Sequence, residues 1–571
     1  MNITPRTPQL SLGDYRAAVE AAYLSDEVKQ QCQRLWSRDP SLWSPEALVQ
    51  EKIRERLGWL HVADTMYDRL SDLRSFTDQI MRDGFTQVVL LGMGGSSLAP
   101  EVLAMIFGAA PGHPQLLVVD TTSPRAIHSV CALVDFDRTL FIIASKSGTT
   151  TETLALEQYF FERIRTQKGD ATGRQFVSIT DPGQALAVSS EQRGYRRVFL
   201  NFADIGGRYS ALSYFGLVPA ALLGVDLKLF IERAQQEMAL SMSGLNNAAY
   251  QLGSVLGTLA KHGRDKLTLV LSPDLRPLGA WIEQLVAESL GKDGVSIVPI
   301  DTEPLGAPEV YGQDRLFVSV SAGTDRRRDG GLDALARAGH PVVRWCVNDR
   351  YDTAAEFFRW EFATAVAGAV LRVNPFDEPN VAESKEATRS ALVQWENTGE
   401  LFSEPPLSQD RWLVAFGSGA MFDGCATIES CLTALVRSIV PGDYFTILAY
   451  LAQEPSVDEC LHDLRRAVGR KLCVATTIGY GPRYLHSTGQ LHKGGPNNGA
   501  FLQLTCTPDK DLAIPTAPYS FGVLHRAQAL GDFTALQDRS RRVLCVHLGS
   551  DVDSGLESLR RRLYATLGLA G

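Results

Sequence analysis

The chain has 571 residues and a formal net charge of −9. Hydrophobic residues make up 45% and charged residues 21% of it, which is typical of globular proteins and excludes fibrous and linker classes. The negative net charge argues against a nucleic-acid-binding protein, because such proteins usually carry a basic domain or stripe. A phosphate ligand stays compatible with this charge, because a few local groups and helix N-termini can bind an anion.

Nine cysteines are scattered along the chain without a CxxC pair, which predicts reduced, mostly buried thiols in a cytoplasmic protein. The N-terminal stretch MNITPRTPQLSLGDYRAA lacks the charged start and apolar run of a signal peptide. No apolar run reaches the ~18 residues that a membrane-spanning helix needs. We therefore expect a soluble cytoplasmic protein with no membrane and no nucleic-acid partner.

The N-terminal region, residues 1–60, is expected to be helical. Tyr15, Val19, Ala22 and Tyr23 follow the helical period and predict an amphipathic helix.

Short apolar runs then alternate with stretches of helix length, which is typical of βα units and of parallel sheets covered on both faces. One set of runs lies within residues 61–240 and a second within residues 241–398. The runs are 88–92, 116–120, 139–145 and 176–180 in the first set and 266–272, 316–321 and 341–347 in the second. The sequence therefore predicts an α/β fold with two doubly wound parallel-sheet subdomains.

A third set of runs indicates a further C-terminal α/β region over residues 399–571. The polar, proline-bearing stretch 399–410 marks its start. Its predicted strands lie within 411–419, 471–479, 500–505 and 542–549.

A glycine- and serine-rich turn follows the first predicted strand, in LLGMGGSSLAPEVL. Gly92, Gly94 and Gly95 allow a tight turn, and Ser96 and Ser97 stand where a helix should begin. Helix N-termini offer unpaired N–H groups and a partial positive charge, and hydroxyl groups add neutral donors. This turn can therefore bind a phosphate, although taken alone it is equally consistent with a capped βα turn.

A second turn of the same kind lies in FIIASKSGTTTETL. Ser145, Ser147, Thr149, Thr150 and Thr151 cluster there after a predicted strand. Ligands of open α/β sheets bind outside the carboxyl ends of the strands, where both turns lie. Their joint occurrence in one α/β unit favours a phosphate-bearing ligand.

Five segments, in order, resemble the sugar-isomerase family and in particular glucose-6-phosphate isomerases. GMGGSS is similar to the family's GIGGS, and residues 145–153 are similar to its Ser-Lys-Thr-x-Thr-Thr-x-Glu-Thr pattern. The other three are IGGRYSALSYFG (205–216), EQLVAESLGKDG (283–294) and NPFDEPNVAESK (374–385), which are similar to the family's GGR, ESxGK and FDQxGVExxK segments. The resemblance implies two sugar-isomerase (SIS) subdomains.

The resemblance also implies roles for single residues. Glu288 matches the catalytic base, which moves a proton between C1 and C2 through a cis-enediol(ate). Arg208 would stabilise the developing negative charge, and Lys385 would assist ring opening. The residues expected to bind the substrate are Gly95, Ser96, Ser145, Lys146, Ser147, Thr150, Gly207 and Glu378.

The chain departs from the family pattern at the ring-opening histidine. Glu309 stands where that histidine is expected, and Glu378 replaces the glutamine of FDQ. The C-terminal LHSTGQ, residues 485–490, resembles the LHSMGQ-like segment of bacterial isomerases. We expect His486 to fold over the cleft and open the ring; the alternative is that this glycine-rich loop only packs or lies on the surface. The extra region and these departures resemble the isomerase half of bifunctional transaldolase/glucose-6-phosphate isomerase proteins, but no transaldolase barrel is visible.

The resemblance implies reversible isomerisation of glucose 6-phosphate and fructose 6-phosphate in glycolysis and gluconeogenesis, without a metal or cofactor. It also implies a homodimer. Three alternatives stay open: an isomerase of another phosphosugar, such as mannose or glucosamine 6-phosphate; a sugar-phosphate-binding regulator that has lost catalysis; and a dinucleotide-binding oxidoreductase. The last rests on GMGGSS alone, which lacks the third glycine of the dinucleotide fingerprint, with Asp120 as its candidate acidic residue.

Overall fold

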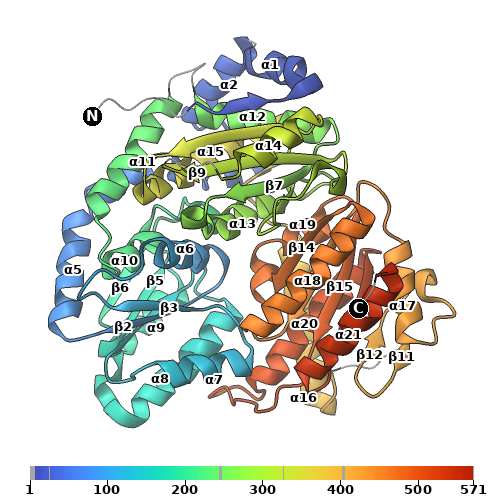
Figure 1. Ribbon diagram of the computed structural model, residues 1–571. Coiled ribbons are helices and arrows are strands. Elements are labelled where there is room, and N and C mark those ends of the chain that lie inside the picture. Colours follow the sequence, from blue (N-terminus) through green and yellow to red (C-terminus); the bar gives the residue numbers. More distant parts are fainter. Residues whose placement is uncertain are drawn as a thin grey trace.

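The computed structural model describes residues 7–569 except 25, 243–246, 324, 326 and 402–404, and side chains are not described for residues 23–29. Three sheets organise the chain, and helices lie between and around them (Figure 1). The predicted α/β class with parallel sheets is therefore confirmed. None of the described helices combines the length and apolarity needed to cross a membrane.

The first sheet has the strand order β3-β2-β4-β5-β6, and all its pairs are parallel. Its strands are β2 (Gln87–Gly92), β3 (Gln115–Val119), β4 (Thr139–Ala144), β5 (Phe176–Thr180) and β6 (Arg197–Leu200). Every residue of β4 and β5 is buried, as expected for parallel strands with helices on both faces. The covering helices include α5 (Leu70–Arg82), α6 (Leu98–Phe107), α7 (Pro124–Leu133), α8 (Thr151–Lys168), α9 (Ala185–Gln192) and α10 (Tyr214–Leu222).

The second sheet has the order β1-β10-β9-β7-β8. Its strands are β1 (Gln9–Ser11), β7 (Lys266–Leu271), β8 (Val298–Ile300), β9 (Arg315–Ala322) and β10 (Val342–Val347). It packs with α11 (Leu227–Ser241), α12 (Ala248–Lys261), α13 (Leu278–Leu290), α14 (Asp329–Arg337) and α15 (Thr353–Leu371). β1 pairs antiparallel with β10, so the N-terminal region is not purely helical: three of its residues close the edge of this sheet.

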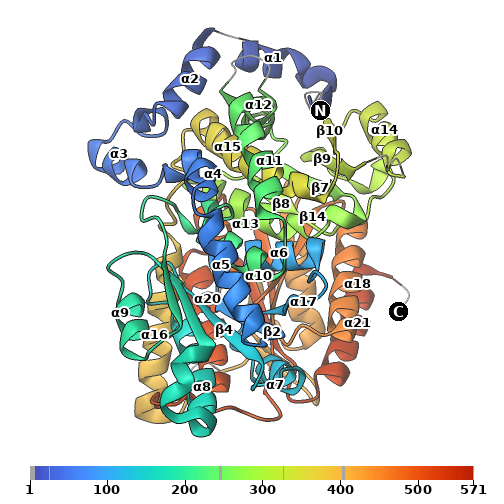
Figure 2. The same ribbon diagram turned by 90° about the vertical axis from the view of Figure 1, so that its left-hand side faces the viewer.

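The rest of the N-terminal region is helical and lies over the second sheet and along its flank (Figure 2). Trp43 and Trp59, which the region contributes to the core, are almost completely buried. Its helices are α1 (Arg16–Leu24), α2 (Asp26–Trp36) and α3 (Ala47–Arg54), and α4 (Val62–Tyr67) follows it in the chain.

The third sheet has the order β11-β12-β16-β15-β13-β14, and its last four strands are parallel. Its strands are β11 (Ser408–Gln409), β12 (Val414–Phe416), β13 (Tyr444–Tyr450), β14 (Ala475–Tyr480), β15 (Gly499–Thr505) and β16 (Arg542–His547). The sequence analysis missed β13, although this strand is fully buried at the centre of the sheet. The helices of this region are α16 (Val381–Thr398), α17 (Ile428–Arg437), α18 (Pro455–Leu472), α19 (Gly489–Gly494), α20 (Phe521–Asp538) and α21 (Val552–Leu567).

The hydrophobic cores cross the boundaries expected from the sequence. One large core contains residues of the N-terminal region and of the first two sheets. Another joins Phe141 and Phe160 of the first sheet and α8 to Phe521 and Leu524 of α20. A third joins Ala287 of α13 to the third sheet. The four-part division of the chain stays a prediction, and the C-terminal region packs firmly against both other sheets.

The segment that contains LHSTGQ is not an open surface loop. It forms a short 3-10 helix (Arg483–His486) followed by α19. Lys493 of α19 is 1% exposed, and its Nζ lies 2.6 Å from Oδ1 of Asp532, which also accepts a hydrogen bond from Tyr484. This buried pair anchors the segment to α20 and thereby fixes the position of His486.

Replacing Lys493 with Met should destabilise the protein by about 3–5 kcal/mol, because the carboxylate of Asp532 stays buried without its cation. The measurement is the urea midpoint of unfolding, with Lys471→Met, which removes an exposed lysine of α18, as the control. Equal midpoints for the two variants would contradict a stabilising role of this ion pair.

Candidate active site

A cavity of about 710 Å³ opens at the carboxyl ends of β2 and β4. In the first sheet the chain runs outward from β2 to β3 on one side and from β4 to β5 and β6 on the other. The strand order therefore reverses between β2 and β4, and open α/β sheets bind their ligands at such a reversal. Both phosphate-type loops of the sequence analysis follow these two strands.

Eleven of the twelve site residues expected from the sequence line this cavity, and one of them, His486, comes from the C-terminal region. The other ten are Gly95, Ser96, Lys146, Ser147, Thr150, Gly207, Arg208, Glu288, Glu378 and Lys385. Ser145 does not line it, but its hydroxyl lies 3.0 Å from that of Thr150 and so supports a lining side chain. Glu309, which stands where the family has its histidine, does not line the cavity.

Gly95 sets the distance between two of the loops. A Cβ atom at this position would lie 2.1 Å from the carbonyl oxygen of Gly207. Only glycine permits this approach, and it brings the GMGGSS loop against the backbone that precedes Arg208.

The second loop leads into the N-terminus of the long helix α8. Thr150 is the N-cap residue, and its side chain does not bond to the first turn of α8. The N–H groups of that turn are thus available to a ligand. Ser147 lies beside them and accepts hydrogen bonds from the N–H and hydroxyl groups of Thr149. This end of the cavity suits an anion.

Lys146 is less free than the sequence suggested. Its ammonium group forms an ion pair with Asp181 and donates to the carbonyl oxygen of Ala203. Burial raises the pKa of Asp181, and Lys146 opposes that shift. Sequence reasoning missed Asp181, which lines the cavity and holds Lys146 in place.

Arg208 is 3% exposed and connects three segments. Its Nε donates to Ser289 of α13 over 2.7 Å, and its Nη2 donates to the carbonyl oxygens of Pro375 and Asp377. Its Nη1 lies 3.3 Å from Glu288 and 3.0 Å from Glu378. One guanidinium thus stands between two carboxylates at the wall of the cavity.

Glu288 lies near the C-terminal end of α13 and is 8% exposed. Burial raises the pKa of this carboxyl above its usual value; Arg208 opposes the shift, and the negative charge of Glu378 adds to it. A buried carboxylate of raised pKa beside a fixed cation can accept and return a proton at neutral pH.

Gln284 was missed by the sequence analysis. It lies four residues before Glu288 on the same face of α13, and that spacing is the signal that could have identified it. Its Nε2 donates both to Glu288, over 3.1 Å, and to the backbone carbonyl of His486, over 2.8 Å. The side chain of Gln284 therefore connects Glu288 to His486 of the C-terminal region.

His486 reaches the cavity from the C-terminal region, and its Nε2 lies 3.0 Å from Oε1 of Glu152. Glu152 is buried, which raises the pKa of its carboxyl, but the charge and hydrogen bond of His486 outweigh this and lower the pKa overall. The ionised carboxylate can only accept, so Nε2 carries the proton of a neutral His486. The other ring nitrogen, Nδ1, is then the one that can exchange a proton with a ligand.

Lys385 projects from α16 into the same cavity. Its charge contributes to lowering the pKa of Glu152, but within the part of the chain that the structure describes Lys385 forms no ion pair. It is therefore a cation available to a ligand. Among the described residues there is no group of three or more His, Cys, Asp or Glu side chains that could hold a metal ion.

Asp120, the acidic residue that a dinucleotide site would require, is engaged elsewhere. It accepts a hydrogen bond from Ser97 and lies 2.9 Å from Nε of Arg483, within the contact between the first sheet and the C-terminal region. This arrangement leaves the oxidoreductase interpretation without its acidic residue.

Comparisons with known proteins agree with this geometry. The phosphoglucose isomerase family model matches residues 62–314, which include Ser96, Arg208 and Glu288 but not Lys385 or His486. A glucose-6-phosphate isomerase of Thermus thermophilus is 29% identical over 385 residues, which are 59% of this chain and 90% of that protein. One of Methanocaldococcus jannaschii is 26% identical over 341 residues, which are 53% of this chain and 83% of that protein.

Two solved structures share the fold. A hypothetical protein from Thermus thermophilus superposes with a TM-score of 0.58 and 23% identity, covering 68% of this chain and all of that one. A glucose-6-phosphate isomerase from Chlamydia trachomatis superposes with a TM-score of 0.53 and 18% identity, covering 70% of this chain and 90% of that one. Over residues 62–314 the chain thus matches the phosphoglucose isomerase family, and it is similar to glucose-6-phosphate isomerases over more than half of its length.

Proposed function

We propose that the protein interconverts glucose 6-phosphate and fructose 6-phosphate. The observation that carries the proposal is the buried Glu288–Arg208 pair, 3.3 Å apart, at the wall of a cavity that two helix-initiating Ser/Thr loops also line. A phosphate at the loops and a proton-transfer pair in the same cavity suit a phosphorylated sugar. The curated relatives named above as glucose-6-phosphate isomerases support this choice of substrate.

In this proposal the phosphate binds at the two loops. The hydroxyl groups of Ser96, Ser147 and Thr150 and the free N–H groups of α8 donate to its oxygens. Ser145 orients Thr150, and Lys146 is held by Asp181 at the side of the cavity. The close approach of Gly95 to Gly207 keeps the GMGGSS loop beside the segment that carries Arg208.

Ring opening is assigned to His486 and Lys385. A proton must leave the C1 hydroxyl of the sugar (C2 in the ketose) and one must reach the ring oxygen. His486 is oriented through Nε2 by Glu152, so its Nδ1 accepts the proton of the hydroxyl and passes it to the ring oxygen. The ammonium group of Lys385 stabilises charge on the sugar oxygens. Glu378 borders the same space and is available to accept from a sugar hydroxyl.

Glu288 then moves the proton between C2 and C1. As a carboxylate it removes the proton from C2 of the open aldose, which gives a cis-enediolate with its negative charge on O1. The hydroxyl proton moves from O2 to O1, and Glu288 returns its own proton to C1, which leaves the carbonyl of the ketose at C2. The oxygen of this intermediate carries developing negative charge, which the guanidinium of Arg208 stabilises. The reaction would serve glycolysis and gluconeogenesis.

All the side chains used in this proposal come from one chain. The homodimer expected from the family resemblance stays a prediction. In this proposal the C-terminal region supplies His486 to the cavity of its own chain.

Glu288→Gln should lower kcat by about 10²–10⁴-fold with little change in KM, because the amide cannot accept the proton. The measurement is a coupled assay of fructose 6-phosphate conversion. Glu283→Gln, which alters a carboxyl on the same helix outside the cavity, is the control and should stay active. Full activity of Glu288→Gln would rule out this residue as the base, and conversion of another phosphosugar alone would change the substrate.

Glu378→Gln should move the acidic limb of the kcat/KM profile to lower pH. Glu288 is inactive when protonated, and the charge of Glu378 raises its pKa, so removing that charge extends the active carboxylate to more acidic conditions. Glu386→Gln, which removes an exposed carboxylate of α16, should leave the limb in place. An unchanged limb, or one displaced to higher pH, would argue against Glu288 as the titrating group.

His486→Ala and Glu288→Gln should not complement each other. Both side chains reach the cavity from the same chain, so a mixture of the two inactive variants contains no intact site. The test mixes the variants under conditions that exchange subunits and measures isomerase activity. A recovery of activity would show that the two side chains meet across two chains.

A further inference from the structure

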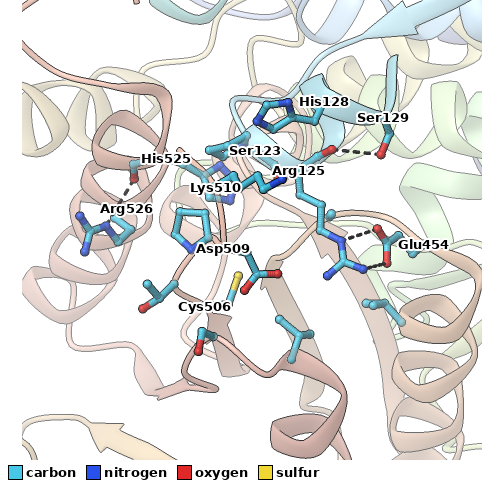
Figure 3. Close-up of a pocket in the computed structure, with 18 residues that line it drawn as sticks. Ser123, Arg125, His128, Ser129, Glu454, Cys506, Asp509, Lys510, His525 and Arg526 are labelled. Carbon is cyan, nitrogen blue, oxygen red and sulfur yellow. Dashed lines mark hydrogen bonds and ion pairs between the residues drawn. The ribbon is translucent and has the colours of Figure 1, made fainter. Parts of the chain in front are cut away.

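A second cavity, of about 390 Å³, lies where the C-terminal region meets the first sheet, apart from the candidate active site (Figure 3). It is lined by residues of α7, of the loops that follow β13, β15 and β16, and of the first turns of α18, α20 and α21. Its size is that of a small-molecule site. None of the residues assigned to the isomerase reaction lines it.

The topology of the third sheet explains its position. The chain runs from β13 outward to β14, returns across β13 to β15, and continues outward in the other direction to β16. The order therefore reverses between β13 and β15, and Ala452 and Cys506, which follow these strands, line the cavity. The candidate active site occupies the corresponding place in the first sheet, and ligands of doubly wound sheets bind at such reversals.

The charges around the cavity favour an anion. Arg125 is already paired with Glu454, over 2.6 and 2.7 Å, at one side of Figure 3. Lys510 and Arg526 also line the cavity, and no carboxylate of the described residues forms an ion pair with either. The exposed carboxylate of Asp509 balances part of this charge. The N-cap side chains of α7 and α18 do not bond to their first turns, which leaves N–H donors there.

A buried histidine supplies the observation that points to a ligand. His525 of α20 lines the cavity and is 6% exposed, and its Nε2 forms no hydrogen bond with any described residue. Burial lowers the pKa of His525 to about 4, although a backbone group of Tyr450 opposes the shift. At neutral pH the ring is thus uncharged. A buried polar atom without a partner is costly unless a ligand or water satisfies it.

The neighbours of His525 show which role its free nitrogen has. The hydroxyl of Thr122 donates to Oε1 of Gln528 over 2.6 Å, so it accepts from Nδ1 of His525, 3.0 Å away. In the neutral ring Nε2 is then an acceptor. Its partner must carry an N–H or O–H group, whereas the cations and helix N-termini require an anion. The apolar walls, made by Pro124, Val457, Pro508 and Val552, suit a carbon skeleton between the two.

The same hydrogen bonds continue to the candidate active site. Nε2 of Gln528 donates to Oε1 of Glu152 over 2.7 Å, and the same oxygen accepts from Nε2 of His486. Thr122, Gln528 and Glu152 are all buried. A donor placed on Nε2 of His525 strengthens its Nδ1–H as a donor, and hydrogen bonds in such a chain polarise one another.

We propose that the cavity between α7, α18, α20 and α21 is an effector site for a small organic phosphate that carries an N–H or O–H group, of the size of a nucleoside monophosphate, and that Thr122, Gln528 and Glu152 couple it to His486. The phosphate lies against Lys510, Arg526 and the helix N-termini. The N–H or O–H group donates to Nε2 of His525. The binding step stands by itself, whereas the coupling rests on the proposed function.

Binding is tested on the full chain by titration calorimetry with AMP, and a double variant of two residues that line only this cavity distinguishes it from the active site. We expect the double variant Lys510→Met/Arg526→Met to bind AMP at least about tenfold more weakly than the unaltered chain, because it lacks two charge-assisted contacts. Lys471→Met/Arg437→Met, which removes two exposed cations outside the cavity, should bind AMP unchanged. Absence of AMP binding, or equal affinity in the three proteins, would overturn the proposal.

Coupling is tested by kcat/KM with and without saturating AMP. We expect AMP to change kcat/KM by about fivefold or more in the unaltered chain. Thr122→Val should still bind AMP but lose the response, because its side chain cannot relay the hydrogen bond, and Thr122→Ser should retain it. Binding without any change in kcat/KM, or an undiminished response in Thr122→Val, would overturn the coupling. Because calorimetry measures AMP binding without turnover, an inactive isomerase is distinguished from a cavity that does not bind AMP.

Discussion

The candidate active site depends on one buried guanidinium. Arg208 follows the first sheet, yet its hydrogen bonds end on Ser289 of α13 and on the backbone of the segment before α16, while its charge stands between Glu288 and Glu378. Taking such a cation out of water is expensive unless acceptors replace the lost hydration. Here backbone carbonyls, a hydroxyl and two carboxylates do so. The contacts that satisfy Arg208 therefore hold its own segment, α13 and the segment before α16 together at the wall of the cavity.

The C-terminal region has a second structural role beside its own core. It is anchored by the buried pair of Lys493 and Asp532 and by apolar contacts with α13 and with the first sheet. From this position it presents His486 to Glu152 and to Gln284, both of which belong to other parts of the chain. The region is thus built into the site, and a ligand in its own sheet's cavity is only a few hydrogen bonds away from His486.

Two of the three sheets place a cavity at the reversal of their strand order. In the first sheet the loops after β2 and β4 form the phosphate-type end of the candidate active site. In the third sheet the loops after β13 and β15 border the cavity that contains His525. The second sheet contributes differently, through Glu288 near the C-terminal end of α13. The physical cause is common to the two cavities: helices depart to opposite faces at the reversal and leave room between their N-termini.

The sequence alone determined the α/β class, most of the strands and the loops after β2 and β4, because apolar runs and glycine- and serine-rich turns are local patterns. It could also name Glu288, Arg208 and His486 as candidates, through motifs that residues close in sequence define. Only the tertiary structure decided that Gln284 joins Glu288 to His486 and that Asp181 neutralises Lys146. The contacts of Gln284 with His486 and of Asp181 with Lys146 join separate segments, and their formation depends on packing that no local pattern encodes.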